Sequence, residues 1–109
     1  MRADRERLLD IKEAIEAIEK YSLENQTDFE ENELIQVWVV HHLRIIGEAC
    51  RALSNNLKKK YSNVPWSKII GMRNILVHAY FRVDAEIAWS VLVNDLPDLK
   101  RQIELMLNE

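Results

Sequence analysis

Helix-breaking residues are nearly absent from this chain, and this restricts its fold more than any other feature. Two glycines and two prolines occur among its 109 residues, too few for the turns of a strand-rich sandwich or barrel. Apolar residues instead recur at steps of three and four, the spacing of one face of an α-helix. We therefore predict an all-α fold, an up-and-down bundle of four to five helices in a single domain spanning residues 1–109.

The apolar spacing also places the first helices. One is predicted at Asp4–Tyr21, followed by a polar connection, Ser22–Asn32, whose anchor to the core is Phe29. A second helix is predicted at Glu33–Lys59. It is apolar well beyond one stripe, so we expect it to be central in the bundle or partly buried in a second copy of the chain.

Prolines and a capping residue mark the later helices. Pro65 is placed to begin a third helix, and Trp66 beside it is expected to pack rather than to stack on bases. Asp84 is a suitable N-cap for a fourth helix, and Pro97 can open a fifth. Gly71 lies inside the third helix, where glycine costs about 1 kcal/mol relative to alanine. Close packing against another backbone would explain it.

Composition excludes several classes of protein. Apolar residues make up 48% of the chain and charged residues 30%, which is typical of a globular protein and not of a disordered one. Cys50 is the single cysteine, so there is no disulfide framework. The charged N-terminus is unlike a signal peptide, and the apolar run at 37–40 is far shorter than the roughly 20 residues of a membrane span. We expect a cytoplasmic protein that does not contact membranes.

The unusual polar residues are concentrated in one apolar stretch, residues 71–81. It contains Arg73, Asn74, His78 and Tyr80. At about 100° per residue, Asn74 and His78 share one face of an ideal helix, and Arg73 and Tyr80 share another. Arg73 and His78 therefore meet only if the arginine reaches around the helix, if the helix distorts, or if a second subunit supplies its own copy.

An arginine and a histidine together suffice for phosphodiester chemistry without a metal. Histidine gives and takes protons near neutral pH. The planar guanidinium of arginine pairs with phosphate oxygens and stabilises charge that develops in the transition state. RNA is the natural substrate, because its 2′-hydroxyl is an internal nucleophile. Spacing alone nevertheless favours a structural role for both residues.

The stretch 72–80 resembles the Arg-x4-His-x-Tyr signature of HepT-like proteins in the HEPN superfamily. The resemblance continues on both sides in the same order, and it covers nearly the whole chain, from Arg7 to about Ile103. The flanking matches are Ile45-Ile46-Gly47-Glu48-Ala49, Val64-Pro65-Trp66, Phe81-Arg82-Val83-Asp84 and Asp95-Leu96-Pro97.

The resemblance implies a HEPN-like domain that forms a homodimer, with a cleft at the interface lined by both copies of the motif. It implies the toxin of a toxin–antitoxin pair, a metal-independent ribonuclease without a cofactor. Arg73 and His78 would be the catalytic pair, and Asn74 would support them. The implied partner is an MntA-like nucleotidyltransferase antitoxin that adds AMP to Tyr80. The added charge and base would compete with RNA for Arg73.

The second helix departs from the family pattern. The family commonly has an acidic residue after the glutamine at position 36 and an Arg-Asn pair further on, whereas this chain has Val37 and then His41-His42. Arg44 stands where an acidic residue is frequent. Adjacent histidines lie about 100° apart on a helix, so they do not comfortably share a metal ion, and we predict no metal site.

Weaker expectations concern the remaining charged residues. Lys58, Lys59 and Lys60 suit the C-terminus of the second helix, and the alternative is that they contact RNA phosphates together with Arg82. Glu48 either orients Arg73 or a backbone group, or is a surface charge. A different function also stays open, that of a non-catalytic helical partner of a nucleotidyltransferase.

Overall fold

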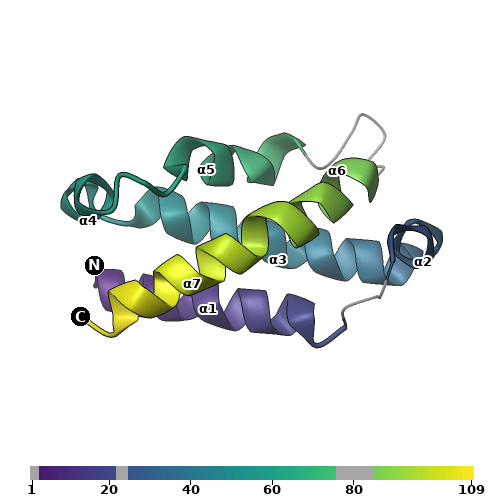
Figure 1. Ribbon diagram of the computed structural model, residues 1–109, viewed down its shortest axis with the longest axis horizontal. Helices are drawn as coiled ribbons and strands as arrows, with labels where there is room; N and C mark the ends of the chain where they lie inside the picture. Colours follow the sequence, from purple (N-terminus) through teal and green to yellow (C-terminus); the bar gives the residue numbers. More distant parts are fainter. Residues whose placement is uncertain (1–2, 22–24, 76–84) are drawn as a thin grey trace.

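The computed structural model describes residues 3–21, 25–75 and 85–109, with the backbone alone at residues 72–75. In these residues long helical segments run alternately up and down, and the short helices α2 and α4 lie at opposite ends (Figure 1). This confirms the predicted all-α bundle. The elements are α1 (Asp4–Glu19), α2 (Gln26–Glu31), α3 (Glu33–Ala52), α4 (Asn55–Lys60), α5 (Trp66–Ile75), α6 (Ala85–Ser90), the π-helix η2 (Val91–Asp95) and α7 (Leu96–Leu107).

Helix α3 is the centre of the bundle, which confirms one of the two alternatives for this helix. It packs against α1 on one side and α5 on the other, and α7 lies against α1. The inward positions of these helices form one apolar core, in which Ile11, Leu43, Ile46 and Ile103 are completely buried. No helix in the described part of the chain is long and apolar enough to cross a membrane.

The predicted helix at Glu33–Lys59 is wrong in one respect, because it breaks between α3 and α4. Leu53 and Ser54 have extended backbones, and the Ser54 hydroxyl accepts a hydrogen bond from the Leu57 N–H as the N-cap of α4. The Asp4 carboxylate at the start of α1 accepts from the Ser54 N–H at 2.9 Å and from its hydroxyl at 2.5 Å. A contact between distant parts of the chain therefore stabilises the break.

The predicted polar connection contains a short helix, α2, which the sequence analysis missed. The Asn25 side chain caps it by accepting from the Asp28 N–H at 2.9 Å. Phe29 is completely buried, which confirms it as the anchor to the core. The Gln36 amide, 9% exposed, donates from Nε2 to the carbonyls of Phe29 and Glu30 at 2.8 and 2.9 Å. This amide joins the end of α2 to α3.

The predicted fifth helix is α7, which has Pro97 in its first turn as expected, but α6, η2 and α7 follow one another as one continuous rod without a loop (Figure 1). Ser90 and Leu96, on either side of η2, both have right-handed helical backbones. Pro97 lies inside the first turn of α7. A proline within a helix crowds the carbonyl four residues before it, and the wider π turn accommodates that crowding. Asp84, the predicted N-cap, lies outside the described residues.

Candidate active site

Helix α5 carries the beginning of the motif, and Trp66 holds its first turn in place. The Trp66 side chain is buried, and its indole N–H lies 3.2 Å from the Lys58 carbonyl and 3.1 Å from the Tyr61 carbonyl. The tryptophan therefore packs, as predicted. Pro65 immediately precedes the helix, and its carbonyl accepts from the Ile69 N–H at 3.1 Å. These contacts attach the start of α5 to the end of α4.

The motif is divided between described and undescribed parts of the chain. Arg73 and Asn74 lie in the last turn of α5, which packs against α3. His78, Tyr80 and Arg82 lie outside the described residues. The pairing of Arg73 with His78 therefore stays a prediction.

Gly71, one half-turn before Arg73, has no close neighbour among the described residues. A Cβ atom built at Gly71 meets nothing within 4 Å. The expected close packing of another backbone against Gly71 is therefore not found among the described residues.

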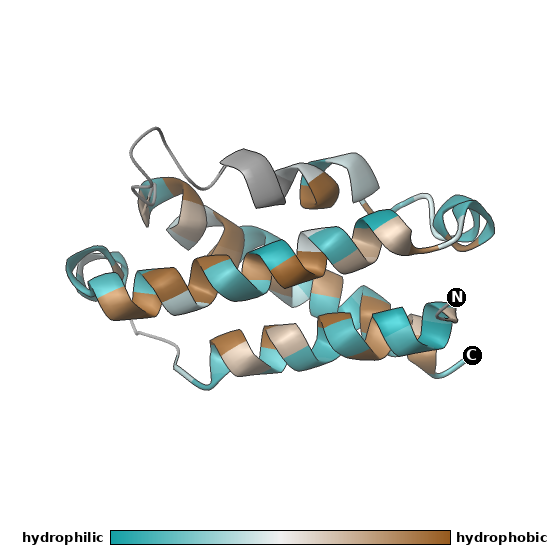
Figure 2. Ribbon diagram, turned by 180° about the vertical axis from the view of Figure 1, so that it is seen from behind, coloured by the Kyte–Doolittle hydropathy of each residue, from teal (hydrophilic) through white to brown (hydrophobic). Residues whose placement is uncertain are grey.

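The outer face of α3, turned toward the viewer in Figure 2, carries an exposed apolar patch near its N-terminus. Leu34 is 83% exposed, Val37 56% and Trp38 36%. The Trp38 indole donates to the Ala17 carbonyl at 2.9 Å and meets the Tyr21 ring edge-on at 5.3 Å. We call Leu34, Val37 and Trp38 the α3 patch. Clustered exposed apolar side chains mark interaction surfaces in soluble proteins.

The same face of α3 carries a polar hollow further along the helix. The hollow has a volume of about 630 Å³ and lies where α3 meets α1. Arg44 is exposed and forms no hydrogen bond or ion pair with the described residues. We call this space the outer hollow. Its lining residues are Arg7 and Asp10 of α1, and His41, Arg44, Ile45, Glu48, Ala49 and Ala52 of α3.

The two adjacent histidines have different surroundings. The His42 ring lies 4.3 Å from the Trp38 ring, and its Nδ1 is 2.8 Å from the Trp38 carbonyl oxygen. His41 is exposed and lines the outer hollow. In the described ranges of the chain, no group of three histidine, cysteine, aspartate or glutamate side chains is arranged to hold a metal ion.

The lysine run occupies the last turn of α4, and two of the three lysines contact another part of the chain. Lys58 Nζ donates to the Arg51 carbonyl at 2.9 Å, so it caps the end of α3. Lys60 Nζ pairs with the Glu109 carboxylate at 3.2 Å. Lys59 is exposed and has no partner in the described residues. Lys58 and Lys60 keep their positive charges in these contacts, and Lys59 is the lysine of the run that makes none with the described residues.

Cys50 cannot serve as a nucleophile in this fold. Its side chain is completely buried on the inner face of α3. Burial raises the pKa of the Cys50 thiol to about 12, and the reactive form of cysteine is the thiolate. The thiol therefore stays protonated and inert at neutral pH.

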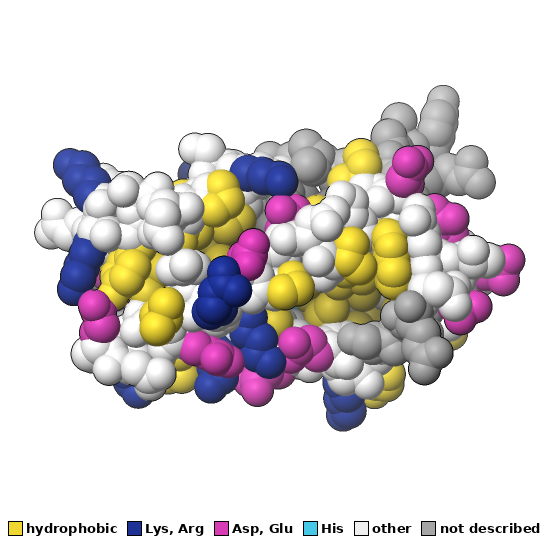
Figure 3. Space-filling model, in the orientation of Figure 1, with side chains coloured by type: hydrophobic (Ala, Val, Ile, Leu, Met, Phe, Trp, Pro, Cys, Tyr) yellow, Lys and Arg dark blue, Asp and Glu magenta, His cyan; other side chains and the backbone are white. Residues whose placement is uncertain are grey.

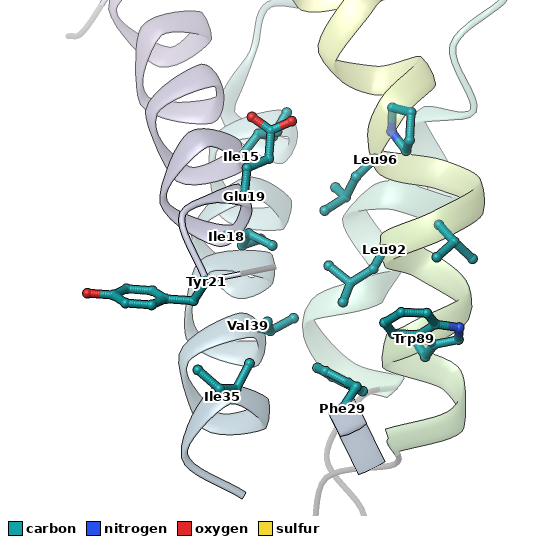
Figure 4. Close-up of a pocket in the computed structure, with 12 residues that line it drawn as sticks. Ile15, Ile18, Glu19, Tyr21, Phe29, Ile35, Val39, Trp89, Leu92 and Leu96 are labelled. Atoms are coloured by element: carbon teal, nitrogen blue, oxygen red, sulfur yellow. The ribbon is translucent and has the colours of Figure 1, made fainter. Parts of the chain in front are cut away.

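An apolar crevice opens on the opposite side of the molecule, between the end of α1 and the rod of α6 and η2 (Figures 3 and 4). It encloses about 180 Å³, and Phe29 and Trp89 meet on its wall with ring centroids 5.7 Å apart. Glu19 on its rim pairs with Lys100 at 2.9 Å. The described lining is mostly apolar and includes no histidine, cysteine or serine.

Comparison with known proteins identifies the class of this helical bundle. Residues 11–106 match the family described as ribonuclease HepT-like. The chain is 38% identical to a Thermococcus cleftensis protein named "Probable ribonuclease HepT", over 94% of each chain. It is 35% identical to the Methanocaldococcus jannaschii protein "Putative RNase MJ1380", over 91% of this chain and 92% of the other. No solved structure shows a significant match.

The match covers most of the chain and includes the motif-bearing helix α5. The chain belongs to the ribonuclease HepT-like family.

Proposed function

We propose that this chain is a metal-independent ribonuclease that cleaves RNA with Arg73 and His78. One observation carries the proposal: the Arg-x4-His-x-Tyr sequence is intact in a chain of the ribonuclease HepT-like family. Two sequence relatives are also named as ribonucleases. The start of the motif lies on α5, which packs beside the central helix α3.

The proposed reaction uses the substrate's own nucleophile. The 2′-hydroxyl oxygen attacks the adjacent phosphorus, and the bond from phosphorus to the 5′-oxygen of the next nucleotide breaks. The products are a 2′,3′-cyclic phosphate and a 5′-hydroxyl. His78 takes the proton from the 2′-hydroxyl or gives one to the departing 5′-oxygen. Arg73 binds the phosphate oxygens and stabilises the charge that builds on them.

The first test is cleavage of RNA by the purified protein in EDTA. Wild type should cleave, and His78→Ala and Arg73→Ala should each lose at least about 100-fold in rate, because each removes a group that acts in the transition state. Circular dichroism shows whether the variants keep their helices. An inert wild type, with Tyr80 unmodified by mass spectrometry, would replace this proposal by the non-catalytic partner of a nucleotidyltransferase.

We also propose that the chain is a homodimer in which the α3 patch is buried. The support is the exposure of Leu34, Val37 and Trp38 on the outer face of the central helix. Val37→Asp should convert the dimer to a monomer in light scattering after size exclusion. Leu105→Asp is the matched control, because Leu105 is 53% exposed on α7, away from the patch. A dimer that tolerates Val37→Asp would exclude the patch as the interface.

The proposed regulator is an MntA-like nucleotidyltransferase antitoxin that adds AMP to Tyr80. The support is positional, since Tyr80 is two residues from His78 in the sequence. With the antitoxin and ATP, we expect the mass to increase by one AMP unit and RNA cleavage to cease, and Tyr80→Phe should block the modification. If Tyr80→Phe is still neutralised, the antitoxin acts by forming a complex instead.

A further inference from the structure

The outer hollow has the dimensions and position of a ligand site. Its volume of about 630 Å³ lies within the range of about 300–1,000 Å³ found for small-molecule sites. Ala49 and Ala52 provide the space, because their side chains end at Cβ while their neighbours on α3 and α1 are long. The hollow lies between α3 and α1, and α5, which carries the start of the motif, packs against the other side of α3.

Arg44 is the cation of this hollow whose charge is least compensated. Arg7 lies close enough to Asp4 for its charge to help lower the pKa of the Asp4 carboxyl. Arg44 is exposed and forms no ion pair with any described residue. Asp10 and Glu48 also line the hollow, and each of them already has an interaction partner in the fold. A bound anion would therefore lie at Arg44, with its guanidinium as the main contact.

The side chains of Arg44 and His41 suit the binding of a segment of single-stranded RNA. A guanidinium pairs with two oxygens of a phosphodiester. His41, exposed beside Arg44, presents an imidazole of the kind on which unstacked RNA bases stack. The sequence also suggested Lys58 and Lys60 as contacts for RNA phosphates. In the structure Lys58 binds the Arg51 carbonyl and Lys60 pairs with Glu109.

We infer that Arg44 binds a backbone phosphate of the RNA strand in the outer hollow, separate from the phosphate that is cleaved. This inference rests on the proposed ribonuclease function. It makes Arg44 a binding residue that affects the affinity for RNA and leaves the chemical step unchanged.

The test compares Arg44→Gln with Arg101→Gln. Both variants lose one positive charge, but Arg101 is on α7, on the other side of the molecule, where it pairs with Asp98 at 2.8 Å. The probe is a short fluorescein-labelled single-stranded RNA with 2′-O-methyl groups, which cannot be cleaved by attack of a 2′-hydroxyl. Fluorescence anisotropy gives Kd over a series of KCl concentrations, and cleavage of the unmodified RNA gives KM and kcat.

For Arg44→Gln we expect Kd and KM to rise about tenfold, kcat to stay unchanged, and the salt slope of log Kd to fall by about 0.7, the value for one phosphate contact on a single strand. Arg101→Gln should match wild type. An unchanged Kd and slope for Arg44→Gln, with wild-type cleavage intact, would overturn the inference alone. Dissociation of the Arg44→Gln dimer would assign Arg44 to the subunit interface instead. A wild type that neither binds nor cleaves RNA would overturn both the inference and the proposed function.

Discussion

Replacing Gln36 with methionine tests whether the buried amide holds α2 against α3. Methionine keeps a similar length and shape but cannot donate a hydrogen bond. The substitution removes the two bonds from Nε2, 2.8 Å to the Phe29 carbonyl and 2.9 Å to the Glu30 carbonyl. A net contribution of about 1 kcal/mol for each bond predicts a loss of about 2 kcal/mol in the free energy of unfolding.

Urea denaturation followed by circular dichroism measures this loss, and thermal unfolding should show a midpoint lower by roughly 5 to 10 °C. Gln26→Met is the matched control. Gln26 is an exposed glutamine on α2 whose Nε2 donates to the Glu30 side chain at 3.1 Å, and such a pair contributes about 0.3 kcal/mol. If Gln36→Met costs no more than Gln26→Met, the assignment of Gln36 as the link between α2 and α3 is refuted.

Four further predictions each concern the surroundings of one residue. Asp4→Asn should cost about 1 kcal/mol at neutral pH, because a charged acceptor of two bonds from Ser54 is lost. The bonds from Ser54 lower the pKa of the Asp4 carboxyl below its ordinary value of 3.8. The ionised carboxylate therefore stabilises the fold above pH 3.8, and the difference in unfolding free energy between wild type and variant should narrow as the pH falls through the lowered pKa. A gap independent of pH would contradict it. Cys50, with its pKa raised to about 12, should resist a thiol reagent at pH 8 until urea unfolds the chain, and rapid labelling of the native protein would show that the site is open. Tyr61→Phe should be neutral or stabilising by up to about 1 kcal/mol, because the Tyr61 hydroxyl is buried and has no hydrogen-bond partner among the described residues. A loss of more than about 1 kcal/mol, measured by denaturation, would mean that the hydroxyl has a partner. Gly71→Ala should raise the free energy of unfolding by about 1 kcal/mol, since its Cβ meets open space; a lower thermal midpoint would mean that another molecule or chain covers this surface.

Local sequence was sufficient to predict most of the helical scaffold. The start of α1 at Asp4 and the burial of Phe29 were predicted correctly. These features depend on a repeat of 3.6 residues and on which side chains avoid water, and both can be recognised within a window of one helix. The motif of Arg73 and His78 was likewise found from residue order alone.

The breaks in the scaffold could not be predicted in the same way. Leu53 continues the apolar spacing of α3, so the sequence indicates an unbroken helix, but Asp4 captures Ser54 across 50 positions of the chain. Pro97 was expected to begin a separate helix, because a helix usually tolerates proline only in its first turn. In the structure the π turn of η2 lets the helix continue through it. Each outcome depends on a neighbour or a backbone geometry that residue spacing does not contain.

Only the tertiary structure shows which cationic side chains have a partner among the described residues. Lys58 and Lys60 are indistinguishable from a phosphate-binding run in the sequence, yet folding brings a helix end to one and Glu109 to the other. Arg44 was noticed in the sequence only as a departure from the family pattern, and in the fold it lines the outer hollow without an ion pair to any residue that the structure describes. Residue order thus determined the helical bundle and the motif that we propose for RNA cleavage. The packing of the helices decided which cations contact a neighbour and which do not, because such contacts depend on the chain segments that the fold brings together.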